Sequence, residues 1–194
     1  MVRAAGVELC SEAFGAPPDP PVLLVDHPSR VLSLVLISTS RAVPGGRGLP
    51  PPTREFTRFV SDARVDWSDA DSVVEYQVAS ARVLAGGRRP FDEAAARDLV
   101  RRDVERARDV AAVRNHDALA DGGRPRAPLA SIAVPALVIH GSADPMFPLA
   151  HGEALAEELP GGRLLVLEDA GHGVGRADWE AVVPAILGHT DIAV

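Results

Sequence analysis

An aspartate and a histidine in the C-terminal third of the chain have the types and spacing of an acid–base pair. Asp144 lies in HGSADPMFP, directly after the apolar run VPALVIHG, and His172 lies in EDAGHG, after the apolar run RLLVLE. A carboxylate bonded to one ring nitrogen of a histidine fixes the tautomer and stabilises the imidazolium, so the other nitrogen can act as a general base. Asp144 and His172 are therefore the candidate catalytic residues.

The elements that must position these two side chains are predicted to be neighbouring parallel strands, at residues 134–141 and 163–168. Continuous apolar runs are typical of strands covered by helices on both faces, and helices are predicted at 149–159 and 179–187. In open α/β sheets, working residues lie beyond the carboxyl ends of the strands, so both side chains should meet at one edge. Taken singly, Asp144 is expected to cap a helix and His172 to be an ordinary loop residue.

The rest of the chain predicts further strands followed by a long helical region. Strands are expected within 6–15, at 22–25 and at 31–37. Helices are expected to begin at the capping residues Thr53, Asp71 and Asp92, the last one running to Ala111. Only the five residues DHPSR separate the second strand from the third, too few for the crossover that two parallel neighbours need. Either those strands pair antiparallel or a segment that normally separates them is missing.

Composition narrows the function classes. The chain has 194 residues, of which 46% are hydrophobic and 24% charged, values typical of one soluble globular domain. Its net charge of −7 gives no basic surface for nucleic acid or anionic membranes, and its longest apolar run, at 31–37, is too short to span a bilayer. A single cysteine, Cys10, fits a reducing compartment and a buried structural thiol. We therefore expect a cytoplasmic protein without nucleic-acid or membrane partners.

These motifs resemble those of the α/β-hydrolases, and among them the esterase-like members that act on small natural-product esters. LCSEAFGAPPDPPVLLV is similar to the opening strands of the family, and DHPSRVLSLVLISTS to the helix end and strand after the nucleophile helix. VPALVIHGSADPMFP is similar to the strand and loop of the triad acid, and AGHG to the loop of the triad base. The resemblance thus assigns Asp144 as the acid and His172 as the base.

The resemblance also implies an architecture and a chemistry. The fold would be α/β, a partial α/β-hydrolase fold with a mostly parallel sheet flanked by helices and a helical cap insertion. Residues 1–44 and 129–194 would form the two parts of a truncated core, and residues 45–128 the cap. The substrate would be a small-molecule ester, and no cofactor is implied.

The chain departs from the family at the nucleophile. No G-x-S-x-G pattern occurs, and Val25 runs directly into DHPSR where a Gly-rich oxyanion loop is expected. The join resembles an in-frame deletion, which leaves a truncated catalytic triad and predicts a chain that is inactive alone. Ser38 and Ser40, at the end of a predicted strand, are the candidates to replace the nucleophile, although such serines more often bond nearby backbone.

Other functions remain open. A non-catalytic ligand-binding or interaction protein derived from a hydrolase is the alternative, with self-association through sheet edges that the deletion exposes. The chain could also be unstable as written, because stability margins are only about 5–15 kcal/mol. A metal site built from His140, Asp144, His151 and His172 matches no tight ligand spacing, so no metal is expected.

Overall fold

The computed structural model describes five segments of the chain in two units, residues 1–32 and 33–194. The described segments are residues 2–4, 7–9, 31–41, 48–112 and 128–191. In the first unit, β1 (Val2–Ala4) and β2 (Val7–Leu9) pair antiparallel, so part of the strand expected within 6–15 is present. Cys10, the strand expected at 22–25 and the DHPSR join lie outside the described residues.

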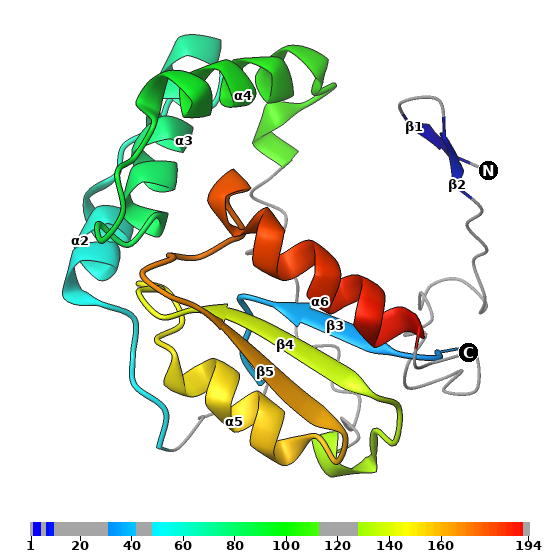
Figure 1. Ribbon diagram of the computed structural model, residues 1–194. Coiled ribbons are helices and arrows are strands. Elements are labelled where there is room, and N and C mark those ends of the chain that lie inside the picture. The colour runs from blue at the N-terminus through cyan, green and yellow to red at the C-terminus, as the bar shows by residue number, and fades with distance from the viewer. Residues whose placement is uncertain (1, 5–6, 10–30, 42–47, 113–127, 192–194) are drawn as a thin grey trace. The chain divides into compact units, whose positions relative to one another are not determined.

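The second unit is built on a parallel sheet of three strands in the order β3–β4–β5 (Figure 1). The strands are β3 (Leu34–Ile37), β4 (Ala136–Gly141) and β5 (Gly162–Leu167). Leu34 lies opposite Ala136 in the register, and Ala136 lies opposite Gly162. These strands confirm the three predicted at 31–37, 134–141 and 163–168. Among the described residues, no strand pairs with the outer edge of β3.

Helices cover both faces of this sheet, as the uninterrupted apolar runs predict (Figure 1). On one face α5 (Ala150–Glu158) contributes Leu155 to a buried cluster with Val138, and on the other α6 (Trp179–Asp191) contributes Val182 to a cluster with Ile139. All six residues of β4 are buried, which makes it the central strand of the core.

The last helix is longer than predicted. α6 continues to Asp191, beyond the predicted end at Leu187. Pro184 lies inside α6, beyond its first turn. Within the described ranges, no helix is both long and apolar enough to cross a membrane.

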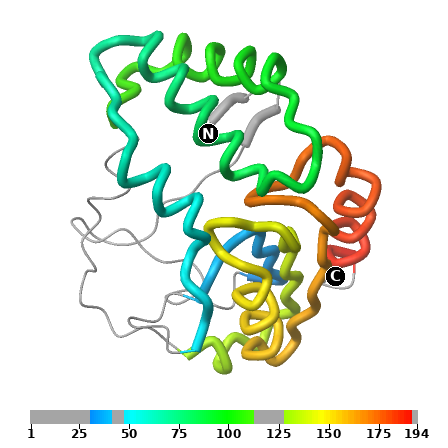
Figure 2. The backbone as a smooth tube through the Cα atoms, turned by 90° about the vertical axis from the view of Figure 1, so that its left-hand side faces the viewer, coloured from blue at the N-terminus to red at the C-terminus, as the bar shows by residue number. Residues whose placement is uncertain are grey.

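A layer of three helices is inserted between β3 and β4: α2 (Arg54–Asp62), α3 (Ala70–Leu84) and α4 (Glu93–Arg106). Figure 2 shows α2 leading into α3 and α4, which lie side by side. The predicted caps Thr53 and Asp92 are confirmed, since their side chains accept hydrogen bonds from the backbone N–H groups of Phe56 and Ala95.

Two details of this layer were predicted wrongly. The cap of α3 is Asp69 and not Asp71, because the Asp69 carboxylate accepts the backbone N–H of Asp71, which lies in the first turn. α4 ends at Arg106 and not at Ala111, because Ala107 takes an extended conformation with φ −69° and ψ 133°.

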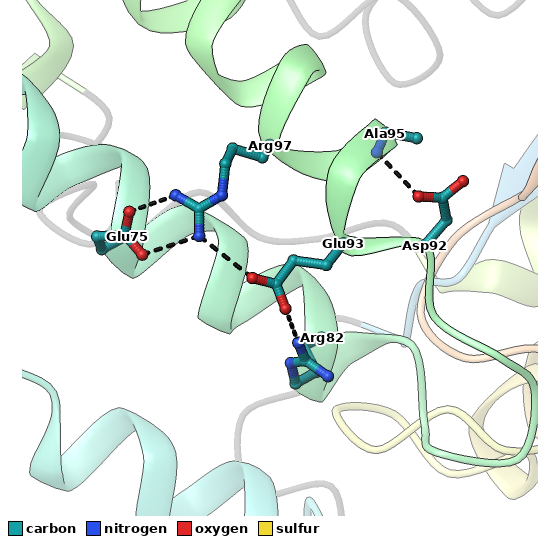
Figure 3. Close-up of polar contacts among 6 residues, drawn as sticks. All are labelled: Glu75, Arg82, Asp92, Glu93, Ala95 and Arg97. Atoms are coloured by element: carbon teal, nitrogen blue, oxygen red, sulfur yellow. Dashed lines mark hydrogen bonds and ion pairs between the residues drawn. The ribbon is translucent and has the colours of Figure 1, made fainter.

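Charged side chains join α3 to α4 (Figure 3). Arg97 of α4 donates to both carboxylate oxygens of Glu75 on α3. Nη2 of Arg97 also lies 3.3 Å from Oε1 of Glu93. The carboxylate of Glu93 pairs in turn with Arg82 of α3. The hydrogen bonds from Arg97 hold the pKa of Glu75 below its usual value, and Glu75 raises the pKa of Arg97. Because these ion pairs are largely exposed to solvent, they contribute little to the stability of the fold.

Candidate active site

Asp144 and His172 meet at the carboxyl edge of the sheet, as predicted. Oδ2 of Asp144 lies 2.8 Å from Nδ1 of His172. Because a carboxylate only accepts, the imidazole carries its proton on Nδ1, and the lone pair of Nε2 points away from Asp144. The Asp144 side chain is fully buried, whereas that of His172 is 23% exposed. No described residue is hydrogen-bonded to Nε2 of His172, so this nitrogen is available as a base. The catalytic roles of both residues stay predictions.

The other carboxylate oxygen of Asp144 organises the loop that carries it. Oδ1 accepts hydrogen bonds of 2.8 Å from the backbone N–H groups of Met146 and Phe147. This turn precedes α5, whose own N-cap residue is Leu149, so Asp144 does not cap that helix. Asp144 therefore uses one oxygen for its loop and the other for His172.

A buried histidine lies directly behind this pair. The side chain of His140 is completely buried at the end of β4, and its Nε2 donates to the carbonyl oxygen of Phe147 at 2.7 Å. The same Nε2 lies 3.5 Å from Oδ2 of Asp144, which adds a polar neighbour to the carboxylate. Nε2 of His140 is therefore satisfied, whereas Nδ1 is buried with no partner among the described residues.

The loop that presents His172 is fixed by close backbone approaches on two sides. On one side the N–H of Ala143 donates to the carbonyl of Ala170, and on the other the N–H of His172 donates to the carbonyl of Leu84 at the end of α3. A Cβ at Gly171 would lie 2.1 Å from that Leu84 oxygen, so only glycine fits there. No motif or spacing in the sequence indicates this contact between α3 and the histidine loop.

A pocket of about 670 Å³ opens beside His172, within the size range of small-molecule sites. Apolar side chains from three segments line it, among them Leu84, Leu99 and Val174. Its wall also includes Arg89, whose guanidinium lies 2.6 Å from the buried carboxylate of Asp178. The base of the candidate pair therefore faces a mostly apolar space with a fixed charge pair at its side.

The candidate replacement serines do not contact His172. Ser38 ends β3 with φ +44°, and its backbone N–H donates to the carbonyl of Ile139. The hydroxyl of Ser40 lies 2.6 Å from Nδ1 of a different histidine, His151. The hydroxyl oxygen of Ser142 accepts the backbone N–H of Asp169 in the loop after β5. In the part of the chain that the structure describes, no group of three His, Cys, Asp or Glu residues could hold a metal ion.

The family model of the α/β hydrolase fold matches residues 22–175. Rhodomycin D methylesterase DauP of Streptomyces sp. (strain C5) is 29% identical, over 89% of this chain and 63% of its own length. The pimeloyl-[acyl-carrier protein] methyl ester esterase of Aromatoleum aromaticum is 33% identical, over 75% of this chain and 59% of its own. The chain thus spans less than two thirds of the length of these curated relatives.

Solved structures show the same fold. The 2-hydroxy-6-oxo-6-phenylhexa-2,4-dienoate hydrolase of Rhodococcus sp. strain RHA1 superposes with a TM-score of 0.59 at 22% identity, over 87% of this chain and 58% of its own. The esterase RhEst1 of Rhodococcus sp. ECU1013 superposes with a TM-score of 0.55 at 20% identity, over 87% and 58%. At these identities the likeness concerns the fold alone.

Proposed function

Because the chain belongs to the α/β-hydrolase fold family, we propose that Asp144 and His172 are the acid and base of a site for small carboxylic esters. The 2.8 Å contact between Oδ2 of Asp144 and Nδ1 of His172 carries the proposal, because it leaves Nε2 free to take a proton. The apolar pocket beside His172 suits the body of a small ester, and two matched relatives are named as methyl ester esterases. In this proposal, α2, α3 and α4 form a cap within residues 45–128, over a core made of 1–44 and 129–194.

We further propose that this pair has no nucleophile of its own in this chain. The sequence contains no G-x-S-x-G, and the serines described near the sheet edge do not contact His172. Without a hydroxyl to deprotonate and oxyanion donors to stabilise the tetrahedral intermediate, His172 lacks the two largest contributions to acyl transfer. Ester hydrolysis through His172 is therefore absent in the chain alone.

The absence of hydrolysis through His172 can be tested by parallel assays of the wild type and His172→Ala. The substrates are p-nitrophenyl acetate and an aromatic methyl ester. We expect equal rates for the two proteins, because Nε2 of His172 has no partner to activate. A wild-type rate that His172→Ala abolishes would contradict the missing nucleophile. In a chimera that receives the G-x-S-x-G segment of a relative between Val25 and Asp26, hydrolysis should rise above the wild-type rate, and this increase should require His172. A folded chimera in which the increase persists after His172→Ala would contradict the assignment of the base.

The edge of β3 with which no described strand pairs favours a second candidate function, self-association with another copy of this chain. An unpaired strand edge offers backbone groups to another chain, and Ile37, at the end of β3, is 42% exposed. Ile37→Lys is expected to shift the protein from oligomer to monomer, because a charged side chain on an edge strand opposes pairing. Light scattering over a concentration series measures the mass, with Val60→Lys on α2, where Val60 is 55% exposed, as a control that should leave the mass unchanged. A wild type that is monomeric at all concentrations would rule this function out.

A further inference from the structure

A serine–histidine pair lies beside the Asp144–His172 pair, since the ring of Phe147 contacts both His151, at 5.3 Å between centroids, and His172, at 5.7 Å. The hydroxyl of Ser40 lies 2.6 Å from Nδ1 of His151, and Nε2 of the same ring lies 2.9 Å from the carbonyl oxygen of Pro50. The three residues come from separate segments: Ser40 follows β3, Pro50 precedes α2 and His151 lies in the first turn of α5.

The partners of the imidazole fix its tautomer. A backbone carbonyl has no proton to give, so Nε2 of His151 must donate to Pro50. Nδ1 of the neutral ring then carries the lone pair, and the hydroxyl of Ser40 donates to it. This is the arrangement of a nucleophile hydrogen-bonded to a base that a third group orients, with a carbonyl in place of a carboxylate.

We propose that Ser40 is a nucleophile activated by His151 and oriented through the Pro50 carbonyl, which reacts with activated acyl and phosphonyl compounds independently of His172. This goes beyond the proposed function, which concerns a different histidine. The substrate class is that of small esters with good leaving groups, since no described residue is assigned as an oxyanion donor. Ser40 and His151 are both only partly buried, so a small reagent can reach them.

Neighbouring residues hold this pair in position. Nη1 of Arg41, the residue after Ser40, lies 3.2 Å from Oε2 of Glu158 at the far end of α5, so the serine segment is tied to the helix that carries the base. His151 lies in the first turn of α5, at the positive end of the helix dipole. This field attracts an oxyanion that forms beside Ser40 but disfavours the imidazolium that forms on His151, so the two effects oppose each other.

The chemical steps are those of acyl transfer. The oxygen of Ser40 bonds to the carbonyl carbon of the ester while its proton moves to Nδ1 of His151. The bond to the leaving group then breaks, and the leaving alkoxide or phenolate takes the proton from Nδ1. Water, deprotonated by Nδ1, attacks the acyl-serine, releases the carboxylic acid and restores the Ser40 hydroxyl. With a fluorophosphonate, Ser40 displaces fluoride from phosphorus and the reaction stops at the phosphonyl-serine.

Incubation of the full chain with a serine-reactive fluorophosphonate, followed by intact-mass and peptide mass spectrometry, tests the proposal. We expect one adduct per chain, mapped to Ser40, in the wild type and in His172→Ala. Ser40→Ala should abolish it, and His151→Ala should slow labelling about 100-fold, the lower range for loss of a general base. Ser131→Ala is the matched control, because its hydroxyl donates to the Pro128 carbonyl, and it should label like the wild type.

The outcomes separate this proposal from a merely structural hydrogen bond. Imidazole added to His151→Ala should partly restore labelling. A hydrogen bond that only joined the two segments would not lead to such a recovery. Peptide mapping of the wild type needs no variant to fold, so an adduct on Ser38 or another serine, or none at all, overturns the proposal. An adduct lost in His172→Ala but kept in His151→Ala also overturns it. The ester assays of His172→Ala test the proposed function separately.

Discussion

Replacing Asp144 by alanine is expected to lower the free energy of unfolding by about 3–5 kcal/mol, since each buried donor left without an acceptor costs roughly 1–3 kcal/mol. The carboxylate is fully buried and accepts from the backbone N–H groups of Met146 and Phe147 and from Nδ1 of His172. Alanine has no acceptor, so three donors lose their partner at once. Urea titration followed by circular dichroism measures the change.

Asp144→Asn is the control that separates the effect of Asp144 on its own loop from its effect on the tautomer of His172. Its amide oxygen can still accept from Met146 and Phe147, so the stability loss should stay near about 1 kcal/mol, the value of one ordinary hydrogen bond. Its amide nitrogen faces Nδ1 of His172, which must then accept, so the proton moves to Nε2 and the base is lost. A stability loss as large in the asparagine variant as in the alanine variant would contradict this division between the two oxygens.

The sheet was predictable because its strands are buried on both faces. All six residues of β4 are buried, and its sequence is apolar except for His140, so the run marks the strand. The helix boundaries were harder. Two aspartates, Asp69 and Asp71, are equally good caps by type, and only the extended backbone at Asp69 selects it. The fifteen residues directly after Arg106, ARDVAAVRNHDALAD, contain no glycine or proline that would indicate the end of α4.

The part of the candidate site that depends on the order of the strands could be predicted from the sequence. Asp144 and His172 each follow a strand of one parallel sheet, so topology alone brings them to the same edge. The pair formed by Ser40 and His151 joins residues 111 positions apart, and no spacing rule relates a strand end to a helix start across an inserted layer. The same holds for the bond between His172 and Leu84, which depends on how α3 lies against the loop after β5.

That contact makes Gly171→Ala a damaging change near the candidate base. An added Cβ would lie 2.1 Å from the carbonyl oxygen of Leu84 and 2.4 Å from the carbonyl carbon of Ala85, both backbone atoms that side-chain rotation cannot move. Overpacking of this kind costs about 3 kcal/mol, and relief requires the histidine loop to separate from α3. We therefore expect a large drop in the denaturation midpoint and loss of amide protection at His172, whose N–H donates to Leu84.

Gly188→Ala is the matched control, because it adds the same methyl group where nothing lies within 4 Å. Gly188 is exposed inside α6, where alanine is favoured over glycine by about 0.5–1 kcal/mol, so this variant should be slightly more stable than the wild type. Opposite signs for the two glycine substitutions would mean that the α3 contact holds the His172 loop. Equal effects at both positions would mean that Gly171 is not packed against α3, and that the position of the candidate base depends on Asp144 alone.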